Sequence, residues 1–291
     1  MKLLNFSIAG RASFGALAPE GIVDLRARLG VASSDLTAFI RATGPVACAA
    51  LTERLAAAMT GAADHRLDAV KILVPAGRTR YFCIGINYPE RNEEYKDGSE
   101  RPKYPSVFMR THTSLVAHGE PIVRPRESRQ LDYEGEIVVV IGRGGRRIPE
   151  RDALAHVLGY TCGNEGSVRD WLRHAKFNVT PGKNFDRSGS IGPWLVTADE
   201  IGTGPLAVST RVNGELRQQD TSDRMIFPIP ALIAYLSAFC TLEPGDVIFS
   251  GTPSGAGARF DPPRYLEPGD VVEVQVSGVG TLRNEVIDDA A

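Results

Sequence analysis

Short apolar runs separated by glycine and proline turns dominate the chain beyond about residue 80, a pattern typical of a mostly β domain. The clearest run, Ile137–Ile141, is entirely β-branched and ends at Gly142. It predicts a buried strand whose side chains alternate between two faces. Turns such as Pro244-Gly245-Asp246 separate the runs. Further strands are predicted at residues 81–85, 106–109, 194–197, 207–212, 246–249 and 271–276.

Helical spacing is less frequent and predicts helices at 149–157, where Pro149-Glu150 suits a first turn, and at 229–239. The N-terminal part of the chain differs, because a short alternating stretch precedes an Ala-rich segment of helical spacing at 51–63. The segment Val74-Pro75-Ala76-Gly77 then interrupts the pattern. We therefore expect an α+β fold that is mostly β, with a small N-terminal α/β module at 1–74 and a larger domain at 75–291.

Composition excludes several classes of partner. The 291 residues carry a formal net charge of −2, so the chain has no basic field to attract nucleic acid or a membrane surface. Apolar runs are far shorter than the ~18 residues that span a bilayer, and polar residues interrupt the start too early for a signal peptide. The cysteines form no CxxC pair, which argues against a zinc knuckle or a disulfide framework. We expect a cytoplasmic protein without nucleic-acid or membrane partners.

Two carboxylates stand at the start of the best-defined strand, in the segment Asp132-Tyr133-Glu134-Gly135-Glu136-Ile137. Glu134 and Glu136 are two residues apart and share a face, roughly 7 Å apart at Cα if each residue rises ~3.3 Å. Two carboxylates on one face suit a hard cation. Two solvated carboxylates on an edge strand are the alternative, and the residues of this segment alone leave both open.

Three other segments combine small residues with polar groups. Glu165 offers a third carboxylate between Gly163 and Gly166, and Lys183 lies between a glycine and an aromatic residue. Thr252 belongs to a Gly-rich turn after the strand predicted at 246–249. Small residues at such turns allow the backbone to approach a ligand.

With these segments, the chain resembles the fumarylacetoacetate hydrolase family from about residue 80 to about residue 286. The matching motifs, in the family's order, are Gly85-Ile86-Asn87-Tyr88, Asp132-Tyr133-Glu134-Gly135-Glu136, Gly159-Tyr160-Thr161 with Ser167-Val168-Arg169-Asp170, Gly182-Lys183-Asn184-Phe185, Gly192-Pro193-Trp194, Val212-Asn213-Gly214-Glu215, Pro244-Gly245-Asp246-Val247-Ile248, Gly251-Thr252-Pro253 and Gly278-Val279-Gly280.

The resemblance implies a mixed β-sandwich and β-roll catalytic domain, with an N-terminal accessory domain of the kind that some bacterial members carry, and a homodimer. It also implies Mg²⁺ or Mn²⁺ held by Glu134, Glu136 and Glu165, a set of oxygen ligands that suits a hard octahedral ion. Substrates of the family are 2-oxo or 1,3-diketo acids that chelate the metal. Polarising the keto group in this way stabilises an enolate.

Further site residues follow from the resemblance. Lys183 matches the lysine that stabilises the substrate oxygens, and Thr252 matches a residue expected to contact the substrate carboxylate. Arg169 matches the arginine after the third ligand, where it either anchors substrate or pairs with a neighbouring carboxylate. A solvated lysine at 183 and a turn-capping threonine at 252 are the corresponding structural alternatives.

The chain departs from the family's hydrolases at the lid, where Asn87–Glu94 carries Arg91 in place of a histidine. A guanidinium stays protonated and cannot serve as the base that activates water. We therefore expect Arg91 to contact substrate and Glu94 to act as the base if lid closure desolvates it. The polar segment 92–97 has the composition of such a lid. Other departures are Glu165 in place of aspartate and Leu172 in place of glutamine, and His112 is considered as a replacement for the lid histidine.

Three functions remain from the sequence. The leading one is a divalent-metal-dependent hydrolase of C–C bonds in small 2-oxo or 1,3-diketo acids, of the acylpyruvate or aromatic ring-cleavage type. The alternative is a decarboxylase or an isomerase/tautomerase of the same substrates, of the 5-carboxymethyl-2-hydroxymuconate or 2-hydroxyhepta-2,4-diene-1,7-dioate type. A non-catalytic protein that binds the metal and a keto acid is the third.

Overall fold

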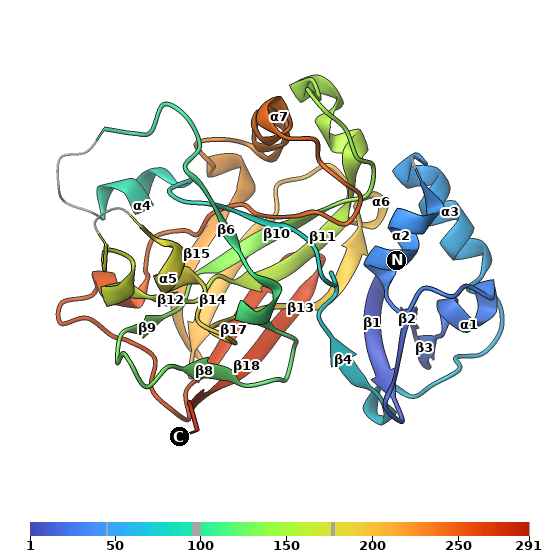
Figure 1. The fold of residues 1–291 in the computed structure, drawn as a ribbon, viewed down its shortest axis with the longest axis horizontal. Helices are drawn as coiled ribbons and strands as arrows, with labels where there is room; N and C mark the ends of the chain where they lie inside the picture. Colours follow the sequence, from blue (N-terminus) through green and yellow to red (C-terminus); the bar gives the residue numbers. More distant parts are fainter. Residues whose placement is uncertain (45, 95–99, 176–177, 291) are drawn as a thin grey trace.

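Two β-sheets pack against each other in the computed structural model, which describes residues 1–44, 46–94, 100–175 and 178–290 (Figure 1). The larger sheet has the order β3-β2-β1-β13-β11-β10-β16-β5-β6, with β4 beside β1 and β7 beside β13. Its strands are β1 (Lys2–Ile8), β2 (Arg11–Ala18), β3 (Gly21–Val23), β4 (Lys71–Leu73), β5 (Tyr81–Ile84), β6 (Val107–Arg110), β7 (Leu115–Val116), β10 (Gly135–Ile141), β11 (Val157–Asn164), β13 (Gly189–Thr197) and β16 (Val247–Phe249).

The second sheet has the order β15-β14-β17-β18-β8, and a short pair, β9 with β12, lies next to the candidate site. Valine and leucine side chains of β14, β17 and β18 share one buried core with β10 and β11 of the larger sheet. The strands of these smaller groups are β8 (Ile122–Arg124), β9 (Leu131–Asp132), β12 (Ser167–Val168), β14 (Ala207–Val212), β15 (Glu215–Thr221), β17 (Val271–Val276) and β18 (Gly280–Asp288).

Helices are short and surround the sheets. In Figure 1, α1 to α3 lie on the right with the N-terminal strands, and α4 and α5 lie on the left. The α-helices are α1 (Leu25–Leu29), α2 (Leu36–Thr43), α3 (Cys48–Ala57), α4 (Pro89–Glu93), α5 (Thr180–Lys183), α6 (Ala198–Ile201) and α7 (Ile229–Phe239). The 3-10 helices are η1 (Leu67–Ala69), η2 (His112–Ser114), η3 (Glu150–His156), η4 (Arg169–Trp171), η5 (Ser222–Arg224) and η6 (Gly257–Arg259). None of the described helices is long and apolar enough to cross a membrane.

The predicted mostly β, α+β fold is confirmed, and β10 is an interior strand of the larger sheet. It pairs with β11 along its length and with β16 at Val138–Val140, and Glu134 and Glu136 at its start are buried, so the alternative of two solvated carboxylates on an edge strand is wrong. Ile137, Val139 and Ile141 enter the core shared with the second sheet, whereas Val138 and Val140 enter a core shared with the N-terminal residues. Side chains of β10 therefore alternate between two buried faces, as the β-branched run predicts.

The region predicted as a helix at 149–157 differs in detail. It forms the 3-10 helix η3, and Val157 already begins β11. Val157 belongs to the strand because it pairs with Ile141 of β10, and the backbone of β11 continues against β13 at Gly159.

The N-terminal strands continue the larger sheet. Lys2 and Leu3 of β1 pair antiparallel with Val196 and Leu195 of β13. The N-terminal core residues pack with those of β5, β10 and β16 in one cluster. A separate N-terminal domain that ends at residue 74 stays a prediction.

Candidate metal and substrate site

Three glutamates converge at one end of the central strands. Glu136 lies in β10, Glu134 just before it, and Glu165 just after β11. Strands β10 and β11 pair so that Glu136 lies opposite Gly163, and the Glu165 N–H donates to the Glu134 carbonyl at 2.8 Å. One carboxylate oxygen from each glutamate lies within 4.8 Å of the others, and all three side chains are buried.

A close approach of two backbone segments positions Glu165. Gly166 follows it, and a Cβ at this position would lie 1.8 Å from the Ser188 carbonyl oxygen, so a larger residue would displace the chain. The Asn164 side chain accepts a hydrogen bond from the Glu134 N–H at 2.9 Å, which ties the segments of two ligands together. The longer glutamate side chain is thus accommodated by a strand end and a close backbone contact.

Lys183 ends α5 and lies within this cluster. Its Nζ donates to Glu134 Oε2, Glu165 Oε2 and Ser167 Oγ, each at 2.6 Å, and lies 5.2 Å from the centre of the Phe108 ring. Burial alone would lower the pKa of Lys183, but the charges of Glu134 and Glu165 raise it above its usual value. The side chain is therefore a buried, protonated ammonium among carboxylates.

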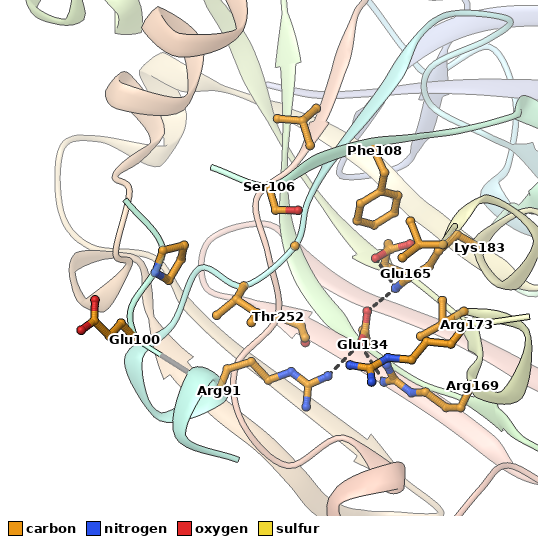
Figure 2. Close-up of a pocket in the computed structure, with 16 residues that line it drawn as sticks. Arg91, Glu100, Ser106, Phe108, Glu134, Glu165, Arg169, Arg173, Lys183 and Thr252 are labelled. Carbon is orange, nitrogen blue, oxygen red and sulfur yellow. Dashed lines mark hydrogen bonds and ion pairs between the residues drawn. The ribbon is translucent and has the colours of Figure 1, made fainter. Parts of the chain in front are cut away.

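Glu134 receives two guanidinium groups as well as the ammonium (Figure 2). Arg91 Nη2 and Arg169 Nη2 donate to its Oε1 at 3.0 and 2.7 Å. Burial alone would raise the pKa of Glu134, but the charges of Arg169, Lys183 and Arg91 hold it well below its usual range. This carboxylate is ionised and retains oxygen lone pairs for a further ligand.

Glu136 has the opposite electrostatic environment. Its Oε2 accepts the Gly251 N–H at 2.7 Å. Burial, reinforced by the negative charges of Glu165 and Glu134, raises its pKa well above the usual value. A divalent cation would supply the counter-charge that lets all three buried carboxylates ionise, and three carboxylates suit Mg²⁺ or Mn²⁺. The residues present therefore fit the metal that the resemblance implies.

Two charged residues of the site were missed by sequence reasoning. Arg110, fully buried at the end of β6, donates to Glu165 Oε1 at 3.0 Å and to the Gly166 carbonyl at 2.8 Å. Asp132 accepts from Arg169 Nε at 2.7 Å and from the Gly257 N–H at 2.8 Å. Asp132 belongs to the acidic motif, so its proximity was visible, whereas nothing around Arg110 in the sequence distinguishes it from a surface arginine.

The lid residue Arg91 contacts Glu134, and Glu94 in turn contacts Arg91. Arg91, in α4, is 2% exposed, and its Nη1 donates to Glu94 Oε2 at 2.7 Å. Glu94 Oε1 accepts the Gly255 N–H at 2.6 Å. Both oxygens of Glu94 are therefore engaged, and its role as a base stays a prediction. Residues 95–97 of the predicted lid lie outside the described part of the chain.

Thr252 lines the cavity with its hydroxyl already in use. Gln218 Nε2 donates to Thr252 Oγ1 at 2.8 Å, and that hydroxyl donates to the Gly135 carbonyl at 2.9 Å. Contact with substrate at this residue stays a prediction. His112 is exposed and lines a different pocket, with Asp35 and Tyr81, so it does not replace the lid histidine.

The site opens into a cavity of about 490 Å³, large enough for a small organic acid. Glu134, Glu165, Arg169, Lys183 and Thr252 lie on its wall. The remaining lining residues are Gly85, Ile86, Arg91, Glu100, Pro102, Ser106, Val107, Phe108, Leu172, Arg173 and Val179.

The fold and this cluster of carboxylates define a family. Residues 80–287 match the family model described as fumarylacetoacetate (FAA) hydrolase C-terminal, and the chain belongs to this family of enzymes, as the sequence motifs predict. Oxaloacetate tautomerase YisK of Bacillus subtilis is 42% identical over 232 residues, which cover 78% of this chain and 76% of the relative. The mitochondrial oxaloacetate tautomerase fahd2 of Xenopus laevis is 39% identical over 75% of this chain and 69% of its own.

A solved structure covers the N-terminal region too. Maleylpyruvate hydrolase from Sphingobium sp. SYK-6, in complex with manganese(II) and pyruvate, matches 100% of both chains with a TM-score of 0.80 and 26% identity. The names of the sequence relatives agree better with the isomerase or tautomerase alternative than with C–C hydrolysis. Because a mitochondrial protein is among these relatives, a cytoplasmic location stays a prediction.

Proposed function

We propose that this chain is a divalent-metal-dependent keto–enol tautomerase of small 2-oxo acids, with oxaloacetate as the first substrate to test. Arg91 carries this proposal, because a buried guanidinium occupies the lid position where hydrolysis requires a group that can accept a proton. Tautomerisation needs no activated water. The tautomerases among the relatives support the same reaction.

Glu134, Glu136 and Glu165 would hold Mg²⁺ or Mn²⁺, which when bound would supply a Lewis acid for the keto group of the substrate. In the proposed reaction a proton leaves the carbon next to the keto group, and a proton is taken up at the keto oxygen. Lys183, a buried ammonium, stabilises the negative charge that develops on that oxygen.

Glu94 is the proposed acceptor of the carbon-bound proton. It must first exchange one of its two hydrogen bonds, from Arg91 or from the Gly255 N–H, for the substrate. Arg169, which is held by Asp132 and Glu134, and Thr252 both line the cavity and are proposed to orient the substrate. The reaction is a proton transfer at balanced charge, without an oxidant or a reductant.

C–C hydrolysis is the second candidate, supported by the hydrolase whose structure matches the whole chain. The two reactions separate in a direct assay. Purified protein with Mn²⁺ is expected to accelerate the decay of enol-oxaloacetate, followed by its ultraviolet absorbance, and to leave acylpyruvates intact. Glu136→Gln, nearly isosteric, is expected to abolish Mn²⁺ binding in calorimetry together with turnover.

Cleavage of acylpyruvates without tautomerase activity would replace the proposal with hydrolysis. Failure to turn over either substrate, with Mn²⁺ still bound, would favour the keto-acid-binding alternative. Turnover that survives in Glu136→Gln would refute the proposed metal site. A homodimer stays a prediction, which the molar mass in solution decides.

A further inference from the structure

Among the described residues, four basic side chains line the cavity, and three of them already have acidic partners. Arg91 pairs with Glu94 and Glu134, and Lys183 pairs with two glutamates of the triad. Arg169 likewise pairs with two carboxylates, at 2.7 Å each. These three basic groups are therefore already engaged by carboxylates of the protein itself.

Arg173 is the fourth. It follows η4, on the same wall as Arg169, and in Figure 2 its side chain extends toward Glu134. Among the residues that the structure describes, none has a carboxylate within ion-pair distance of Arg173. It is an exposed residue at the cavity, with a guanidinium available for a second molecule.

A 2-oxo dicarboxylate substrate needs a cationic group such as the Arg173 guanidinium for its second carboxylate. Its keto oxygen and neighbouring carboxylate belong at the glutamate triad under the proposed function, on which this inference rests. The second carboxylate then projects into a cavity whose nearby wall includes the apolar Leu172, Val179 and Phe108. A carboxylate there without a cationic partner is unfavourable, and a guanidinium can accept it with two parallel hydrogen bonds.

We propose that Arg173 is a specificity-determining residue that binds the distal carboxylate of the substrate. It gives the site a preference for 2-oxo dicarboxylates over 2-oxo monocarboxylates. The expected contribution is a charge-assisted hydrogen bond, which corresponds to about tenfold to a hundredfold in affinity.

Binding of unreactive analogues tests this inference without relying on turnover. Malate carries a distal carboxylate and lactate lacks it, while both offer the same hydroxy-acid head. Calorimetry of the Mn²⁺-loaded protein is expected to show malate binding at least tenfold tighter than lactate. Arg173→Ala is expected to remove that preference and leave lactate binding unchanged, and Arg173→Lys to restore part of it.

Arg151→Ala, an exposed arginine of η3 away from the cavity, serves as the matched control and is expected to keep the preference. In turnover, Arg173→Ala is expected to raise KM for oxaloacetate about tenfold or more with little change in kcat. An unchanged malate preference in correctly folded Arg173→Ala, judged by its thermal unfolding, would overturn the inference. A malate preference that depends on Arg173 in a protein without tautomerase activity would uphold it and overturn the proposed function alone.

Discussion

Removing the ammonium of Lys183 tests the electrostatics of the site. Lys183→Met keeps a similar shape but leaves Glu134 and Glu165 without a cation that contacts each of them at 2.6 Å. Breaking a buried ion pair from one side costs about 3–5 kcal/mol. Against a typical stability of about 5–15 kcal/mol, the variant is expected to fold with a clearly reduced free energy of unfolding.

Although Lys183→Met is expected to destabilise the fold, the same substitution is expected to strengthen Mn²⁺ binding. Without the ammonium, a cation at the triad no longer experiences repulsion from Lys183, so Mn²⁺ is expected to bind Lys183→Met at least about tenfold more tightly. Because tenfold in affinity is about 1.4 kcal/mol, saturating Mn²⁺ then stabilises the variant by about that much more than the parent. Tautomerase turnover is expected to fall although metal binding improves.

Urea denaturation, once with EDTA and once with Mn²⁺, measures both effects. Lys71→Met is the matched control, because its 2.6 Å pair with Glu120 is at the surface and a surface pair contributes about 0–1 kcal/mol. Equal losses of stability for the two variants in EDTA would refute the buried position of the ammonium. Weaker Mn²⁺ binding by Lys183→Met would refute its placement beside the cation.

Two other substitutions test Arg91 in the lid and the buried ion pair between Arg110 and Glu165. Arg91→His supplies a side chain that can accept a proton, so hydrolysis of an acylpyruvate is expected to appear in a turnover assay, and its absence would show that residue 91 does not select the reaction. Arg110→Met leaves Glu165 without its 3.0 Å partner, and a loss of about 3–5 kcal/mol is expected in urea denaturation. A loss below about 1 kcal/mol would show that Glu165 is neutral in the folded protein.

The strands that sequence reasoning found are those whose side chains match strand periodicity. Residues 207–212 and 271–276 form β14 and β17 with the predicted bounds. Strand β11 was not predicted because Gly159 and Gly163 weaken its β pattern. In the structure both glycines allow close packing against neighbouring elements. Strand β18 was not predicted because Asn284 interrupts its apolar positions. This residue points inward, and its amide donates to the Ala117 and Glu120 carbonyls. A buried polar residue with partners distant in sequence looks like a turn residue.

The same distinction applies to the site. Glu134 and Glu136 are close in sequence, and their spacing on one strand face is a local property. Arg110 reaches Glu165 across 55 positions, from the end of β6 to the residue after β11, although β10, β16 and β5 lie between these two strands in the sheet. Only the folded chain supplies that contact, because no periodicity in the sequence links the two segments.

The contacts of Glu134 connect the lid with the reaction. Segments that carry Arg91, Arg169 and Lys183 all meet at this one carboxylate. A neutral imidazole at residue 91 would leave a lone pair to accept a proton from water, whereas Arg91 places a permanent positive charge beside the glutamate triad. The guanidinium stabilises negative charge that develops on substrate oxygens, but it cannot accept the proton that hydrolysis removes from water. The triad alone fits either reaction, and the guanidinium beside it favours tautomerisation.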